Sequence, residues 1–435
     1  VYGQDNVIDE VVWVVGDEAI LKSDVENERL NAQYEGRKFD GDPYCIIPEQ
    51  LAIQKLFLHQ AAIDSIEVSE QEIISDVERR TNWLIDQIGS KEKVEEYYNK
   101  TSTQIREMLR ENIRDGKTVQ KMQQQIVGDI KITPAEVRRY FKDLPQDSIP
   151  FIPTQVEVQI ITMEPKIPQE EIERVKKTLR DYTERVTSGE IAFSTLARLY
   201  SEDEGSRRRG GELGFMGRAE LVPEYANVAF NLQDPNKVSK IVESEFGFHI
   251  IQLIEKRGDR INTRHILLKP KVDEKDLEAA LLRLDSIAND IRNEKFTFDD
   301  AATYISHDKD TRNNHGLMAN PQTGTARFEM QQLAQVSQEA AKMVEGMNVG
   351  EISKPFTMIN AKGKEICAIV KLKTRLNGHK ATITEDYQRL KGIVMEKRSE
   401  EKLDKWIRDK QKHTYVRINE KWQKCDFKYP GWVKK

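Results

Sequence analysis

The order and spacing of short motifs between residues 196 and 253 constrain the fold of this chain more than any other feature. A serine-acid segment, YSEDEG, precedes the pair Gly210-Gly211, and an LVPEY segment leads on to the closing EFGFHIIQL. The paired glycines predict a tight turn that requires positive φ, and GFHIIQL is typical of a short buried strand that begins at a glycine. Each motif alone is common in globular proteins, so their order and spacing carry the information.

This order of motifs resembles the parvulin, or rotamase, family of peptidyl-prolyl isomerases. The pattern of that family has its pocket residues at the positions of Asp203, Gly210-Gly211, Leu221, Tyr225 and His249. The resemblance implies an α+β domain that binds an extended chain and rotates the peptide bond before proline.

The resemblance also implies a role for each side chain. Leu221 and Tyr225 would seat the proline ring, and Phe248 would also contact the substrate. Asp203 would face the carbonyl of the twisting amide, and His249 would belong to the hydrogen-bond network behind that acid. A structural interpretation stays open for all of them, with Asp203 in a solvated loop and the others in the core.

One position departs from the family. The first strand of a parvulin normally offers a histidine, as in R-H-I-L, whereas this chain reads V-Q-I-I and has Gln159 in that place. Glutamine forms hydrogen bonds, but it carries no charge and has no tautomers. We therefore expect a weakened catalytic set of Asp203, His249 and Gln159.

A weaker second copy of the pattern begins near residue 262. It opens on RHILL, with His265 at the first-strand histidine position, and it keeps an acid, Asp308. Ala368 replaces the other histidine, NNHGLM replaces the double glycine, and no aromatic residue matches Tyr225. The histidine pair is thus expected to be split, so that neither copy has the whole set. We expect the second copy to be a binding or spacer domain, with a core role for His265 and a loop role for Asp308 as the alternatives.

The rest of the sequence predicts an α+β multidomain protein in which helices flank the two copies. Capping boxes such as Ser69 with Glu72 predict a mainly helical domain over residues 1–150, which begins with a small hairpin. The two parvulin-like domains are expected at 151–257 and 258–376, because two copies of this size indicate a repeated domain rather than a solenoid. Residues 377–435 predict a helix and a strand too small to fold alone. We expect them to dock on the first domain, with the strand extending its hairpin.

This arrangement is similar to that of the SurA-like family of periplasmic chaperones, and the ILKSDVENE start and the YVRI ending support the likeness. The resemblance implies export to the periplasm. The chain begins at Val1, which suits a mature protein after removal of a signal peptide.

Composition argues against several other classes. The net charge of −5 is spread over interspersed acids and bases, so no nucleic-acid partner is expected. No apolar run approaches the ~20 residues of an integral membrane segment, and no P-loop or G-x-G-x-x-G indicates a nucleotide. The three cysteines lack C-x-x-C spacing, so neither a metal nor another cofactor is expected. Cys45 and Cys425 can form one disulfide if the chain ends pack together, while Cys367 is expected to be a buried thiol.

Two functions follow from the sequence. The first is an isomerase of X-Pro bonds in unfolded or extended polypeptides, which by the family likeness would be exported outer-membrane proteins. The alternative is an ATP-independent holdase, in which the helical ends of the chain hold clients and the parvulin-like domains only bind peptide.

Overall fold

The computed structural model describes residues 9–434, which fall into two compact units. Among these residues, the terminal unit joins 9–146 to 382–434, and the central unit comprises 147–381. The mainly helical first domain is therefore completed by the C-terminal helix, as the sequence predicted. Within the described residues, every helix is too short or too polar to cross a membrane.

The terminal unit contains a small sheet built from both ends of the chain. Strand β1 (Val11–Val15) lies between β2 (Glu18–Leu21) and β13 (Val416–Ile418), and both pairings are antiparallel. The C-terminal strand thus extends the hairpin that opens the unit. The helices of this unit are α1 (Lys22–Tyr34), α2 (Pro43–Ile63), α3 (Glu70–Ile88), α4 (Lys91–Tyr98), α5 (Ser102–Val127), α6 (Pro134–Asp143) and α14 (Tyr387–His413).

The C-terminal segment of this unit is fixed by packing, by a disulfide and by a buried acid. Cys45 in α2 and Cys425 form a disulfide that joins positions 380 residues apart. The carboxylate of Glu49, also in α2, accepts hydrogen bonds from the backbone N–H of Tyr429 at 3.0 Å and from Nε1 of Trp432 at 2.7 Å. These donors replace the water that the buried carboxylate loses, which makes its burial tolerable.

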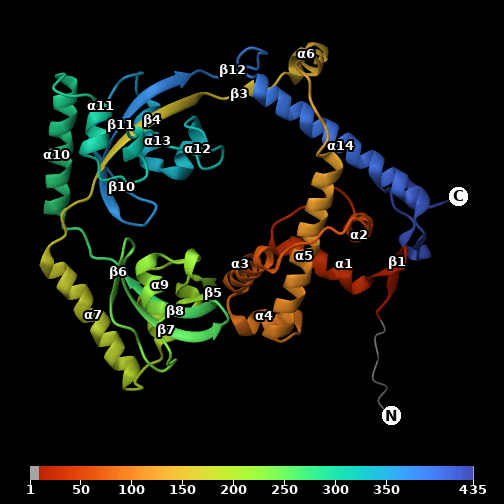
Figure 1. The fold of residues 1–435 in the computed structure, drawn as a ribbon, viewed down its shortest axis with the longest axis horizontal. Helices are drawn as coiled ribbons and strands as arrows, with labels where there is room; N and C mark the ends of the chain where they lie inside the picture. Colours follow the sequence, from red (N-terminus) through yellow and green to blue (C-terminus); the bar gives the residue numbers. More distant parts are fainter. Residues whose placement is uncertain (1–8, 435) are drawn as a thin grey trace. The chain divides into compact units, whose positions relative to one another are not determined.

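The central unit contains two four-stranded sheets, each covered by its own helices (Figure 1). The first sheet has the order β5-β8-β7-β6 and consists of β5 (Glu212–Gly217), β6 (Val242–Ser244), β7 (Gly247–Arg257) and β8 (Arg260–Leu268). Its helices are α7 (Gln169–Thr187), α8 (Phe193–Tyr200) and α9 (Pro223–Ala229).

The second sheet has the order β10-β11-β4-β9 and consists of β4 (Gln155–Met163), β9 (Phe328–Glu329), β10 (Phe356–Ile359) and β11 (Glu365–Leu376). Its helices are α10 (Glu274–Arg292), α11 (Phe298–Tyr304), α12 (Met330–Val336) and α13 (Gln338–Glu345). A two-stranded ribbon of β3 (Phe151–Ile152) and β12 (His379–Lys380) closes the unit at its chain ends.

The two copies exchange their first strands. Strand β4, which the sequence assigns to the first copy, pairs with β11 of the second, and β8, assigned to the second, pairs with β7 of the first. Figure 1 shows β4 in yellow beside β11 in blue, and β7 and β8 together in green. The boundary predicted between 257 and 258 therefore passes through a hairpin rather than between two sheets.

The physical reason for this exchange is a two-residue turn. Arg257 pairs with Arg260, so only Gly258 and Asp259 separate β7 from β8. Gly258 has φ of +61°, which suits the first central position of a hairpin turn. The pairing of β8 with β7 closes a very short loop at little entropic cost, and β4 remains as the partner of β11.

Candidate active site

An acidic loop after α8 forms the first part of the site. The carboxylate of Asp203 accepts hydrogen bonds from Ser206 Oγ at 2.5 Å, from Gly205 N–H at 3.2 Å and from His265 Nε2 at 2.6 Å. Burial alone would raise the pKa of Asp203, but the hydrogen bond and charge of His265, helped by the other two donors, outweigh it and lower the pKa. Asp203 is therefore held as a carboxylate.

Two histidines from neighbouring strands continue this network. His249 on β7 and His265 on β8 stack with ring centroids 5.2 Å apart, and their Nδ1 atoms lie 3.0 Å apart, within hydrogen-bond distance. Nε2 of His249 lies 2.6 Å from Ser244 Oγ. Burial, followed by the charge of His265, lowers the pKa of His249 to about 3, so this ring is neutral. The result is a continuous hydrogen-bonded chain from buried Ser244 through both rings to the partly exposed Asp203.

Tyr225 forms the apolar side of the same site. Its ring packs edge-on against His249 at 5.5 Å and His265 at 5.6 Å, and its hydroxyl lies 2.7 Å from Thr263 Oγ1. Burial raises the pKa of Tyr225, so the phenol stays protonated. Leu221 is half-buried and packs in the same hydrophobic cluster as Tyr225.

Phe248 is not part of this arrangement. Successive side chains of a strand point to opposite faces, so Phe248 faces away from the side of β7 that carries His249. It packs on Val175 and Leu179 of α7 and on Leu196 of α8. The structure thus assigns Phe248 to the core beneath the helices, in a different hydrophobic cluster from that of Tyr225 and Leu221.

Comparison with known proteins assigns two segments of the central unit to one family. Residues 160–255 and 265–374 each match the family described as "PPIC-type PPIASE domain". The chain carries two rotamase domains. Their matched segments correspond to the two sequence copies, whereas the sheets are assembled with the strand exchange described above.

Chaperones resemble the chain along most of its length. Chaperone SurA of Aliivibrio fischeri (strain ATCC 700601 / ES114) is 24% identical over 94% of this chain and 92% of its own. Chaperone SurA of Escherichia coli O157:H7 is 25% identical over 72% of this chain and 75% of its own. A solved structure described as one of "two structurally related SurA-like chaperones in the human pathogen Campylobacter jejuni" aligns with 94% of this chain and 99% of its own, at 8% identity and a TM-score of 0.30.

Gln159 lies outside the first rotamase site. Its side-chain amide donates to Asp299 Oδ1 at 2.7 Å and to the carbonyl of His315 at 2.8 Å, within the second rotamase domain. The prediction that Gln159 replaces the first-strand histidine of the first site is therefore wrong. The strand exchange supplies that site with His265 instead.

Matching hydrogen bonds identify the true counterpart of His265 in the second domain. The N–H of His265 donates to Gly211 O at 3.0 Å, and the N–H of Ile160 donates to Gly316 O at 2.8 Å. Ile160, one residue after Gln159, therefore occupies the histidine position. Successive side chains of a strand point to opposite faces, so Gln159 lies on the face opposite to that of Ile160.

The second domain keeps the scaffold of the site without its histidines. Asp308 accepts a hydrogen bond from Thr311 Oγ1 at 2.6 Å, as Asp203 does from Ser206. Ala368 lies opposite Thr162, just as His249 lies opposite Leu267. Both histidine positions of the second domain, Ile160 and Ala368, are thus apolar, and Asp308 has neither ring behind it.

In both domains a glycine is required because the backbone of the loop lies very close to the backbone of the exchanged strand. A Cβ on Gly211 would lie 2.3 Å from the carbonyl oxygen of His265, and one on Gly316 would lie 2.6 Å from that of Ile160. Only the first glycine of the pair is replaced in the second domain, by His315 at φ of 57°. NNHGLM therefore preserves the glycine that the close approach of the backbone requires.

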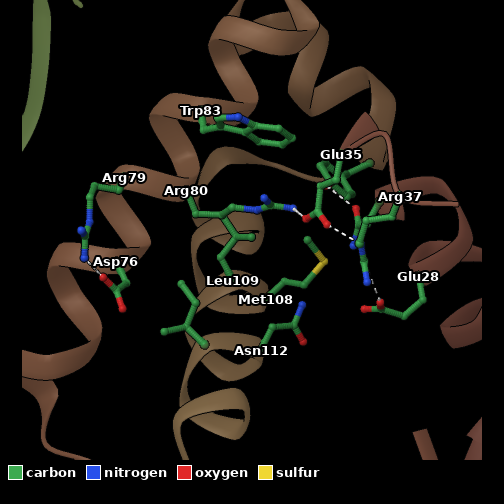
Figure 2. Close-up of a pocket in the computed structure, with 13 residues that line it drawn as sticks. Glu28, Glu35, Arg37, Asp76, Arg79, Arg80, Trp83, Met108, Leu109 and Asn112 are labelled. Carbon is green, nitrogen blue, oxygen red and sulfur yellow. Dashed lines mark hydrogen bonds and ion pairs between the residues drawn. The ribbon is translucent and has the colours of Figure 1, made fainter. Parts of the chain in front are cut away.

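The terminal unit contains a separate cavity of about 520 Å³, bounded by α1, α3 and α5. Figure 2 shows Trp83 above it, Met108 and Leu109 below it, and a row of ion pairs along one wall. In that row, Arg80 and Arg37 each lie 2.6 Å from the carboxylate of Glu35. This cavity combines apolar surface with fixed polar groups, as ligand pockets commonly do. The sequence predicted helices in this unit but did not predict the cavity.

Proposed function

We propose that this protein is a periplasmic chaperone and peptidyl-prolyl isomerase whose isomerase activity resides in the first rotamase domain. The observation that carries the proposal is the hydrogen-bonded chain from Ser244 through His249 and His265 to Asp203, beside the apolar surface of Tyr225 and Leu221. Its substrates are X-Pro bonds in unfolded exported polypeptides, including outer-membrane proteins.

Catalysis at this site involves no covalent step. Rotation about an X-Pro bond is slow because the planar amide is stabilised by resonance, which leaves partial negative charge on the carbonyl oxygen. Twisting the bond removes that charge separation. A carboxylate that faces the oxygen therefore disfavours the planar forms more than the twisted one, and each ~1.4 kcal/mol of such preference gives a tenfold rate.

The network behind Asp203 has a positioning role in this proposal. His265 holds the carboxylate in place and keeps it ionised, while neutral His249 and Ser244 complete the hydrogen bonds of the buried rings. Tyr225 and Leu221 offer the proline ring an apolar seat that excludes water. Without water, the carboxylate acts on the amide at a low local dielectric, where its effect is larger.

Replacement of Asp203 by asparagine tests the isomerase site. Asp203→Asn keeps the shape of the side chain but removes its charge, and we expect turnover in a protease-coupled prolyl assay to fall about a hundredfold. The matched control is Asp308→Asn in the second domain, which should leave turnover unchanged. Equal turnover in Asp203→Asn and the wild-type protein would refute the assignment.

The chaperone part of the proposal is supported by the cavity of the terminal unit. Trp83, Met108 and Leu109 offer apolar surface to a client side chain, and the ion pairs along the wall keep the cavity open. Trp83→Ala should raise the concentration of protein needed to suppress aggregation of an unfolded outer-membrane protein, with prolyl turnover unchanged. The control is Trp422→Ala, in the same unit but outside the cavity lining.

A further inference from the structure

The second rotamase domain contains a groove of about 670 Å³ at the place that corresponds to the first active site. Its lining includes Ile160, Asp308 and Thr311, the counterparts of His265, Asp203 and Ser206. Buried apolar side chains form its floor: Ile160, Met318, Met358 and Ile366. The cavity of the fold and its acid are therefore present, while the two histidines that support the acid in the first domain are replaced.

These replacements make the floor of the groove apolar, whereas the corresponding positions of the first domain are polar. Met358 precedes β11 at the register that Ser244 has before β7, because Phe356 pairs with Ala368 as Val242 pairs with His249. A methionine thus stands where the first domain has the hydroxyl that ends its histidine chain. Methionine side chains adapt to irregular apolar partners, so this floor suits varied hydrophobic side chains.

Cations gather at the rim of the groove. Four cationic side chains line it: Lys309, Arg312, Lys362 and Lys364. The ammonium group of Lys362 donates a hydrogen bond to the carboxylate of Glu245. The hydrogen bond of Lys362, with the charges of Lys362, Lys309 and Lys364, lowers the pKa of Glu245. A carboxylate at this rim is therefore stabilised.

The groove also has acidic rim residues. Asp308 already accepts hydrogen bonds from Thr311 Oγ1 and from the N–H of Asp310, so its carboxylate is partly engaged. Asp310 and Glu164 add negative charge to the lining. Glu245 is a further acid of the lining, and its contact with Lys362 shows that the lysine cluster holds a carboxylate. Because Glu245 already engages Lys362, a client acid would meet Lys309, Lys364 and Arg312.

We infer that this groove binds an extended, proline-independent client segment in which an apolar side chain is followed by a glutamate or aspartate. The apolar side chain lies on the methionine floor, and the client carboxylate contacts Arg312 and the lysines of the rim. The segment is held but not isomerised, because neither Ile160 nor Ala368 supports the acid. This inference deepens the proposed function, on which it rests for the nature of the client.

Methyl spectroscopy of the full chain tests this inference at the groove itself. The probe is a ten-residue peptide without proline that contains leucine followed by glutamate, and the readout is the ¹³C-methyl resonances of Met318 and Met358. We expect both to shift saturably, and a peptide with lysine in place of glutamate to bind about tenfold more weakly. Met216, in the first domain, serves as the internal control and should not shift.

Two charge reversals locate the carboxylate contact. Arg312→Glu should weaken the glutamate peptide about tenfold, whereas Arg283→Glu on α10, which does not line the groove, should have no effect. Unshifted Met318 and Met358 resonances, or equal affinity for the glutamate and lysine peptides, would overturn the inference. Prolyl turnover of the same samples is a separate readout, so a failure of the isomerase assignment is distinguishable from a failure of this groove.

Discussion

The two rotamase domains of this protein share a backbone arrangement and differ in the side chains that face their grooves. In both, a glycine lies against the exchanged strand and an acid accepts a hydrogen bond from the hydroxyl three residues later. The first adds His249, His265 and Ser244, whereas the second has Ala368, Ile160 and Met358 at those positions. The motifs that identify the family are thus those of the scaffold, whereas the proposed chemistry depends on a few side chains that the second domain lacks.

The largest effect on the comparison of the two domains is expected from removing the exchanged strand β8. A fragment of residues 164–272 contains the whole first sheet with β8 and His265, so it should fold and retain prolyl turnover. A fragment of residues 151–257 lacks β8, so the edge of β7 is unpaired and turnover should be lost. Circular dichroism melting and the prolyl assay check both. A folded, active 151–257 fragment would show that β4 replaces β8 and that the exchange is dispensable.

The next largest effect concerns the histidine pair. His265→Gln removes the ring that holds Asp203, and we expect a loss of turnover of about a hundredfold without loss of the fold. Ile160→Val at the equivalent position of the second domain should leave turnover unchanged. A similar loss in both variants would mean that the second domain also contributes to catalysis.

The shared glycine should matter equally in the two domains. Gly211 and Gly316 have φ of +84° and +81°, and each lies against the carbonyl of the exchanged strand. Alanine at either position should cost about 3 kcal/mol of the free energy of unfolding, because both the backbone and its neighbour must shift. Gly324→Ala, with φ of +71° and open space around it, should cost only about 1 kcal/mol. Urea unfolding followed by far-UV circular dichroism measures all three.

Acidification should lower the stability of the first rotamase domain more than that of the second, with a smaller effect than the substitutions above. The pKa of His249 falls from its ordinary 6.5 to about 3 in the folded state, so below pH 6.5 the unfolded chain takes up a proton that the folded chain refuses. The stability that this group contributes is complete above pH 6.5 and is lost as the pH falls towards 3, by up to ~1.4 kcal/mol per pH unit. The lowered pKa of Asp203 acts in the same direction at the acid end of this window.

Native-state hydrogen exchange, corrected for the intrinsic pH dependence of exchange, checks this difference. Protection of β7 should fall between about pH 7 and about pH 5, while that of β11, which has Ala368 in place of the histidine, should change less. Tryptophan fluorescence is unsuitable for this purpose, since Trp13, Trp83, Trp406, Trp422 and Trp432 all belong to the terminal unit. Equal loss of protection in both strands would contradict the assignment of the effect to His249.

Local signals account for the parts of the protein that its sequence predicted well. Capping residues such as Ser69 and Thr133 accept the backbone N–H bonds that start α3 and α6. The motif spacing located two rotamase domains, and it singled out Asp203, Tyr225 and His249, which the structure brings together. The sequence also contained an unused signal, the Gly258-Asp259 pair between two strands, which is typical of a hairpin.

The sequence by itself determined the helices, the strands, the glycine turns and the presence of two related domains, because each depends on residues near one another in the chain. Only the tertiary structure decided which strand completes which sheet, and with it that His265 joins His249 while Gln159 joins Asp299. The reason is that backbone hydrogen bonds between strands do not depend on side-chain identity. Two apolar strands, β4 and β8, were both acceptable partners, and the short turn after β7 selected one of them.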